Sequence, residues 1–313
     1  MPPSAWPSSA LPIAFAITCV ISIYFSNPVH GLDAQTVIDS PLLTKKIGTN
    51  RTIKVDINGD GDFRSVQAAI NSVPEGNAHW TIIHVRKGVY REKVHIPVNK
   101  PYIFLRGNGK GRTAIVWSES SSNNVESAVL RAEAPHFIAF GVSFKNDAPT
   151  GIASTSQNQS VAAFVGSVDF IFGRGRSVFH SCEIFVIGDK RVKIRGSVTA
   201  QNRESENDYS GFVFVKGKVY GVGSVYLGRA KGPHSRVLFA KTYLSKTIAP
   251  QGWTNWSYDG STENLFHAEY KCHGPGSESK ERAAWSRELT EEEVAPFLSI
   301  DYIDGTHWLP VWL

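Results

Sequence analysis

Cysteine and charge are both scarce in this chain. Its 313 residues include three cysteines, one methionine and only 19% charged side chains. Three cysteines are too few for a disulfide-built scaffold. Low charge together with 27 glycines argues against coiled coils and long exposed helices, and 42% hydrophobic residues argue against a disordered chain. The composition therefore favours a turn-rich β protein.

The amino terminus carries an apolar run without charge. Residues 11–25 form this run, and short residues follow up to Gly31. Because a bilayer span needs about 20 apolar residues, the pattern predicts a secretory signal over 1–31, with an anchor helix as the alternative. After this signal we expect a linker over 32–51 and one domain over 52–313.

Secretion bears on the cysteines and on the partners of the chain. Two cysteines remain after cleavage, Cys182 and Cys272, which could pair in an oxidising compartment or stay as buried free thiols. Secretion also permits glycosylation at the sequons of Asn50, Asn158 and Asn255. The net charge of +5 favours an acidic polysaccharide as partner. We expect no nucleic-acid partner, no membrane association and a monomer.

Short apolar runs fill the chain after residue 51, with Gly, Asn, Asp or Pro in nearly every gap. They are too short and too β-branched for core helices, so they are predicted to be strands. The runs are 52–55, 81–85, 102–105, 114–117, 137–144, 168–172, 177–187, 212–220, 225–227 and 236–244.

A weak repeat appears in the second half of the chain. Phe179, Phe214 and Phe239 are each followed three positions on by a small or short residue and five positions on by an aliphatic one. Side chains that recur in this way could stack in rows between solenoid coils. We therefore expect an all-β fold, a parallel β-helix, with a β-sandwich as the alternative. Short helices at 65–70 and after the capping box Thr290–Glu293 would cover its ends.

The segment Asp56–Phe63 resembles the start of an EF-hand loop. Its twelfth position is Gln67 instead of the bidentate glutamate, and 52–55 before it is a predicted strand rather than a helix. The segment is therefore interpreted as a polar turn, and no metal or cofactor is expected.

One carboxylate, Asp169, lies in an otherwise apolar and aromatic run, 166–173. A buried carboxylate needs a cationic partner to stay ionised, and Arg229 at the end of another apolar strand is the candidate. Such a pair could aim a nucleophile, or it could be a buried ion pair that only orders the core.

Five segments around these residues resemble the signature segments of the plant pectinesterases, or pectin methylesterases. They occur in the order of that family, and the similarity runs from about Thr52 to the carboxyl end. The chain resembles the short type, without an inhibitor-like pro-region. The segments are 88–92, 168–173, 199–203, 226–229 and 251–256.

The resemblance implies a right-handed parallel β-helix, secreted to the cell wall, with a cleft for homogalacturonan. Asp169 would attack the methyl-ester carbonyl at C6, Arg229 would hold Asp169, and Gln159 would stabilise the oxyanion. Trp253 would stack on a sugar ring, and Gln201 would bind substrate. A proteinaceous pectinesterase inhibitor is a further expected partner.

Two departures from the family pattern stand out. The arginine segment continues with Ala230 and Lys231 instead of Pro-Trp, which places a cation where it could face a galacturonate carboxylate. In addition, the family's Gln-Asp-Thr-Leu segment, whose Asp is the general acid, is missing at 166/167. Asp147 is the nearest upstream carboxylate that could replace it.

These departures leave four hypotheses. The first is a pectinesterase whose activity is impaired by loss of the acid, and the second is a non-catalytic pectin-binding β-helix. The third is a calcium-dependent pectate lyase. The fourth is an incomplete gene model or splice form of an intact enzyme.

Overall fold

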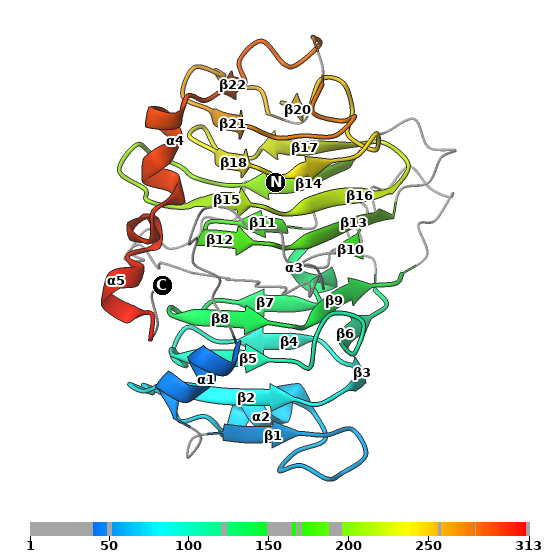
Figure 1. The fold of residues 1–313 in the computed structure, drawn as a ribbon, viewed down its shortest axis with the longest axis vertical. Helices are drawn as coiled ribbons and strands as arrows, with labels where there is room; N and C mark the ends of the chain where they lie inside the picture. The colour runs from blue at the N-terminus through cyan, green and yellow to red at the C-terminus, as the bar shows by residue number, and fades with distance from the viewer. Residues whose placement is uncertain are drawn as a thin grey trace, which may run out of the picture.

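The computed structural model describes residues 40–48, 52–119, 124–148, 165–166, 169, 171–187, 196–255, 258–278 and 280–310. Its strands stack as successive coils along one axis (Figure 1). Every pairing between the described strands is parallel. This confirms the parallel β-helix and excludes the β-sandwich, whose sheets are antiparallel.

Each coil contributes strands to three faces. The first face contains β1 (Thr52–Val55), β2 (Thr81–Val85), β5 (Ile103–Arg106) and β8 (Phe137–Phe140), then β12 (Arg176–His180), β15 (Gly211–Val215), β18 (Arg236–Ala240), β21 (Phe266–Tyr270) and β22 (Arg287–Glu288). The second contains β3 (Gly88–Arg91), β6 (Thr113–Trp117) and β9 (Ser143–Asn146), then β10 (Val165–Gly166), β13 (Glu183–Ile187), β16 (Lys218–Val222) and β19 (Tyr243–Leu244). The third contains β4 (Val94–Ile96) and β7 (Leu130–Ala132), then β11 (Ile171–Gly173), β14 (Gly196–Gln201), β17 (Val225–Ala230) and β20 (Trp253–Thr254).

The hydrogen-bonded ladders are interrupted at one level. Among the described residues, no strand of the first half (β1–β9) pairs with a strand of the second half (β10–β22). In the described part of the chain, the ladders of all three faces therefore end at β7–β9 and resume at β10–β12, which face one another in Figure 1.

The interior of the second half contains the predicted row of phenylalanines. The ring centroids of Phe179 and Phe214 are 4.4 Å apart, and those of Phe214 and Phe239 are 4.3 Å apart. Register pairing aligns the three residues across β12, β15 and β18. The predicted stacking is confirmed.

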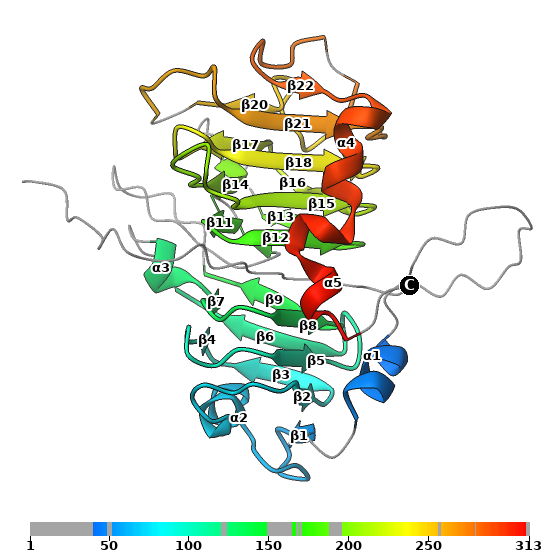
Figure 2. The same ribbon diagram turned by 90° about the vertical axis from the view of Figure 1, so that its left-hand side faces the viewer.

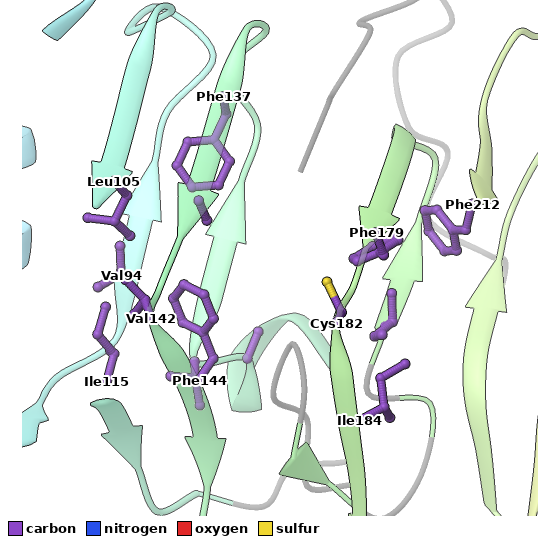
Figure 3. Packing of buried hydrophobic residues seen from close by; sticks show 14 of the residues in the cluster. Val94, Leu105, Ile115, Phe137, Val142, Phe144, Phe179, Cys182, Ile184 and Phe212 are labelled. Carbon is purple, nitrogen blue, oxygen red and sulfur yellow. The ribbon is translucent and has the colours of Figure 1, made fainter. Parts of the chain in front are cut away.

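One buried apolar cluster extends through both halves. It includes Phe137 and Phe144 from the first half and Phe179 and Cys182 from the second (Figure 3). The halves therefore share an interior, although their described strands share no ladder.

Four predicted strands are each two strands joined by a corner. The runs 137–144, 177–187, 212–220 and 236–244 break at Gly141, Ser181, Lys216 and Lys241, whose φ angles are +64°, +55°, +55° and +50°. A residue in the left-handed region turns the chain sharply. Each corner moves the chain from the first face to the second.

The carboxyl-terminal helices form a strap along the first face (Figure 2). The strap comprises α4 (Glu291–Leu298), the 3₁₀ helix η2 (Ile300–Ile303) and α5 (Gly305–Trp308). Phe297 stacks on Phe266 of the second half at 5.0 Å, whereas Trp308 lies 6.0 Å from Trp80 and 5.3 Å from His136 of the first half. The strap therefore crosses the interruption between the halves.

The helices predicted for the two ends of the β-helix domain are confirmed. Helix α2 (Val66–Ser72) follows the cap of Ser65, and α4 begins with the predicted capping box of Thr290 and Glu293. A four-residue helix, α3 (Asn124–Ser127), was not predicted. Ser40–Ile47 forms helix α1, so the predicted linker 32–51 contains a helix. The predicted signal 1–31 lies outside the described residues.

The remaining sequence expectations concern cysteines, calcium and membranes. Cys182 and Cys272 are free thiols, which decides between the two alternatives left open. In the EF-hand-like turn, Asp56 accepts a hydrogen bond from Arg86 at 2.9 Å and Asp62 accepts one from the Lys54 amide at 2.7 Å. None of the helices described here has the length and apolar character needed to cross a bilayer.

Candidate active site

The candidate site lies on the third face, where Asp169 precedes strand β11. Its backbone is in the left-handed region, with φ +47°, and its amide donates to the carbonyl of Ser197 at 2.7 Å. Asp tolerates this conformation better than most residues, although a non-glycine residue there is still uncommon. The turn therefore fixes the direction of one carboxylate.

Arg229 clamps this carboxylate from two coils away. Its Nε lies 2.9 Å from Oδ1 and 2.8 Å from Oδ2 of Asp169, and its Nη2 lies 2.7 Å from Oδ2. Asp169 is fully buried, and Arg229 is only 8% exposed. The predicted ion pair is therefore present, with two guanidinium nitrogens on one carboxylate, a geometry that adds directional specificity to charge.

Ser197 is a third member of the site that the sequence did not reveal. It lies on β14, between Asp169 and Arg229 in the stack, and its hydroxyl donates to Oδ1 of Asp169. The side chain is 1% exposed. The only sequence signal was its position two residues before the signature segment that begins at Thr199, and that signal does not give the register between coils.

Lys231 is next to this cluster and is open to solvent. Its Nζ lies 5.9 Å from the centroid of the Phe172 ring. The pKa of Lys231 is lowered, first by partial loss of hydration and then by the neighbouring Arg229 charge, while Asp169 acts to raise it. The ammonium therefore belongs to the same electrostatic group as the buried pair.

Two residues that were expected to bind substrate are buried. Trp253 is 2% exposed and packs against the ring of His267 at 4.8 Å, so neither ring face is open to a sugar. Gln201 has no exposed surface. Its Oε1 accepts hydrogen bonds from the amides of Arg203 and Arg236 at 3.0 and 2.8 Å. In the described structure these two side chains hold the interior and the turn after β14, and their binding of substrate stays a prediction.

The other two sequence candidates lie elsewhere or outside the described residues. Gln159 belongs to the undescribed part of the chain. Asp147 follows β9 on the second face, where its Oδ2 lies 3.8 Å from Arg91 and its amide donates to the carbonyl of Trp117. The described contacts of Asp147 are therefore on a different face from Asp169.

This arrangement suits nucleophilic chemistry better than metal chemistry. A carboxylate that is kept ionised and aimed by a guanidinium can attack an electrophilic carbon. Within the described ranges, the His, Cys, Asp and Glu side chains form no group of three with metal-binding geometry.

Comparison with known proteins shows which family the chain is similar to. A sequence model of the Pectinesterase family matches residues 52–165 and 153–306. Probable pectinesterase 67 of Arabidopsis thaliana is 59% identical over 331 residues, which cover 95% of this chain and 96% of that protein. Putative pectinesterase 11 of the same plant is 36% identical and covers 82% of this chain and 80% of its own length. Among solved structures, pectin methylesterase from carrot has a TM-score of 0.65 at 25% identity and covers 84% of this chain and 95% of its own.

Proposed function

This chain belongs to the pectinesterase family, and we propose that it hydrolyses the C6 methyl esters of homogalacturonan with Asp169 as nucleophile. Pectin methylesterases are carboxylic ester hydrolases. The observation that carries the assignment to this residue is the buried carboxylate of Asp169, held by two nitrogens of Arg229 in a strained turn.

The neighbours of Asp169 have distinct roles in this proposal. Arg229 keeps the carboxylate ionised and aimed, and Ser197 restrains Oδ1. Attack on the ester carbonyl places negative charge on its oxygen, and Gln159 would donate to that oxygen. One such donor is typically worth ~3 kcal/mol in the transition state.

The proposal includes a reduced rate, because the segment that carries the family's acid is lacking between 166 and 167. Two observations support this. The family's sequence model matches in two pieces that overlap over residues 153–165, and among the described strands no ladder joins β1–β9 to β10–β22. Loss of a positioned acid typically lowers a rate by ~10²–10⁴-fold.

The setting of the reaction follows from the family. We place the mature chain outside the cell, at the cell wall, with pectin as substrate and a proteinaceous pectinesterase inhibitor as a further binding partner. The sequons at Asn50, Asn158 and Asn255 fit that compartment, and so does the net charge of +5, which favours association with an acidic polymer.

A second candidate function is pectin binding without turnover, favoured by the same missing segment. The two functions are separated by measuring methanol release and polygalacturonate binding with the same purified chain. An esterase releases methanol in a manner that depends on Asp169. A binding protein retains the polymer, weakens its hold at high salt and releases none.

A further inference from the structure

The missing segment leaves the reaction without an evident proton donor. When the tetrahedral intermediate collapses, the bond between C6 and the methoxy oxygen breaks, and methoxide leaves poorly unless it receives a proton. The donor must lie beside Asp169, must carry a transferable proton and must reach the substrate.

The residues that interact with Asp169 can be tested against these requirements. The guanidinium of Arg229 does not release a proton in proteins. The hydroxyl of Ser197 is buried and already donates to Oδ1. Lys231 is exposed and carries an ammonium group, and the charges of Arg229 and Asp169 both act on its pKa. Of these three described residues, only Lys231 meets all the requirements.

The strand register places the lysine on the correct side of the sheet. The amide of Lys231 donates to the carbonyl of Gln201 at 3.3 Å, so pairing with β14 continues one residue beyond the end of β17. Side chains two residues apart on a strand point to the same side. Lys231 therefore lies on the side of Arg229, whose guanidinium reaches Asp169.

The contact between Lys231 and Phe172 shows where the ammonium group of Lys231 lies. Phe172 pairs in register with Ala200, and Ala200 pairs with Arg229, so these residues form one row across the third face. The Nζ of Lys231 lies 5.9 Å from the Phe172 ring. It therefore turns back from β17 toward β11, the strand that Asp169 precedes.

We propose that Lys231 is a catalytic residue of this chain and acts as the general acid and base that its missing segment no longer supplies. The inference rests on the proposed esterase function. Asp169 attacks C6, and the ammonium gives one proton to the departing methoxide, which leaves as methanol. The acyl-enzyme anhydride and a neutral Lys231 amine remain.

The same amine completes the cycle. It takes a proton from water as the water oxygen attacks the acyl carbon, and the carboxylate of Asp169 departs as the anhydride bond breaks. The products are the galacturonate acid and the regenerated ammonium. A lysine with a lowered pKa suits both steps, since its ammonium gives up a proton more readily and a larger fraction of it is free amine near neutral pH.

Two substitutions separate proton transfer from mere attraction to the polymer. In Lys231→Arg the positive charge is kept but no proton is released, and in Lys231→Ala both are lost. Lys246→Ala is the matched control, because Lys246 is exposed and its substitution removes the same charge elsewhere. Methanol release from methyl-esterified pectin gives kcat and KM for each chain, and far-UV circular dichroism checks the fold.

We expect both Lys231 variants to lose ~10²–10⁴-fold in kcat, with KM nearly unchanged in Lys231→Arg. Added methylamine should restore part of the activity of Lys231→Ala, and Lys246→Ala should match the unsubstituted chain. An active Lys231→Arg would overturn the proposal, since a bound cation would then be sufficient.

The proposed function has its own control. If Asp169→Asn abolishes release while Lys231→Arg does not, only the role of Lys231 is wrong. If Asp169→Asn releases methanol as fast as the unsubstituted chain, the assignment of Asp169 is wrong. An unsubstituted chain that binds polygalacturonate but releases no methanol contradicts both.

Discussion

The carboxyl-terminal strap should hold the two halves together, and Trp308→Ala tests this. Trp308 is 7% exposed. Its ring contacts Trp80 and His136 of the first half, and its Nε1 donates to the carbonyl of Ile303 at 2.7 Å. Because no described ladder joins the halves, this contact is one that couples them from outside the shared interior.

The expected loss of stability can be estimated from these contacts. Truncating a buried tryptophan to alanine typically costs 3–5 kcal/mol, a range that includes aromatic pairs worth about 0.5–1.5 kcal/mol each. The collapse of α5 onto the gap would lower the cost, so we expect roughly 3 kcal/mol for Trp308→Ala. Trp308→Phe should lose clearly less, because it keeps a ring in the site.

Urea unfolding followed by circular dichroism measures this loss. Phe214→Ala is the control, because Phe214 is buried in the interior row of the second half. Phe214→Ala should lower the free energy of unfolding by a similar amount and leave a single sharp transition, because it does not uncouple the halves. Trp308→Ala should lower the free energy of unfolding and also split or broaden the transition. A Trp308→Ala chain within 1 kcal/mol of the original, with one sharp transition, would refute the bridging role.

Three further predictions follow from buried groups. Arg229→Gln should cost about 3–5 kcal/mol in urea unfolding, since it leaves the fully buried Asp169 carboxylate without its cation; a loss below 1 kcal/mol would contradict the ion-pair account. Burial lowers the pKa of His267 to about 3, so its neutral form stabilises the fold fully above pH 6.5 and that stability is lost as the pH falls toward 3. The largest loss of unfolding free energy from protonating His267 is on the order of 5 kcal/mol, and His267→Gln should flatten the profile of unfolding free energy against pH. Burial raises the pKa of Cys272 to about 12, so iodoacetamide at pH 8 should label it only after unfolding, and rapid labelling of the native chain would show that the thiol is accessible.

Local sequence patterns predicted the repeating parts of the fold. The spacing around Phe179, Phe214 and Phe239 predicted the interior row, because coils of a solenoid place equivalent residues above one another. The corners at Ser181 and Lys216 were missed. Residues with φ near +55° are usually glycine or asparagine, so nothing in their type announces a turn.

The site was predictable in part for a similar reason. Because a buried carboxylate needs a cation, the residue types made Arg229 a candidate partner for Asp169, and the structure contains that pair. The serine hydroxyl at 197 was not predictable, because it reaches Asp169 through the register of β14. The burial of Trp253 was not predictable, since resemblance to a segment does not say which way its ring points in this chain.

The central claim is that the Asp169 carboxylate attacks the methyl ester. The most direct test compares methanol release by the purified mature chain with release by Asp169→Asn, a near-isosteric change that removes the charge. We predict release from the original chain and a loss of at least ~10²-fold in the variant. Equal rates from the two chains would contradict the account.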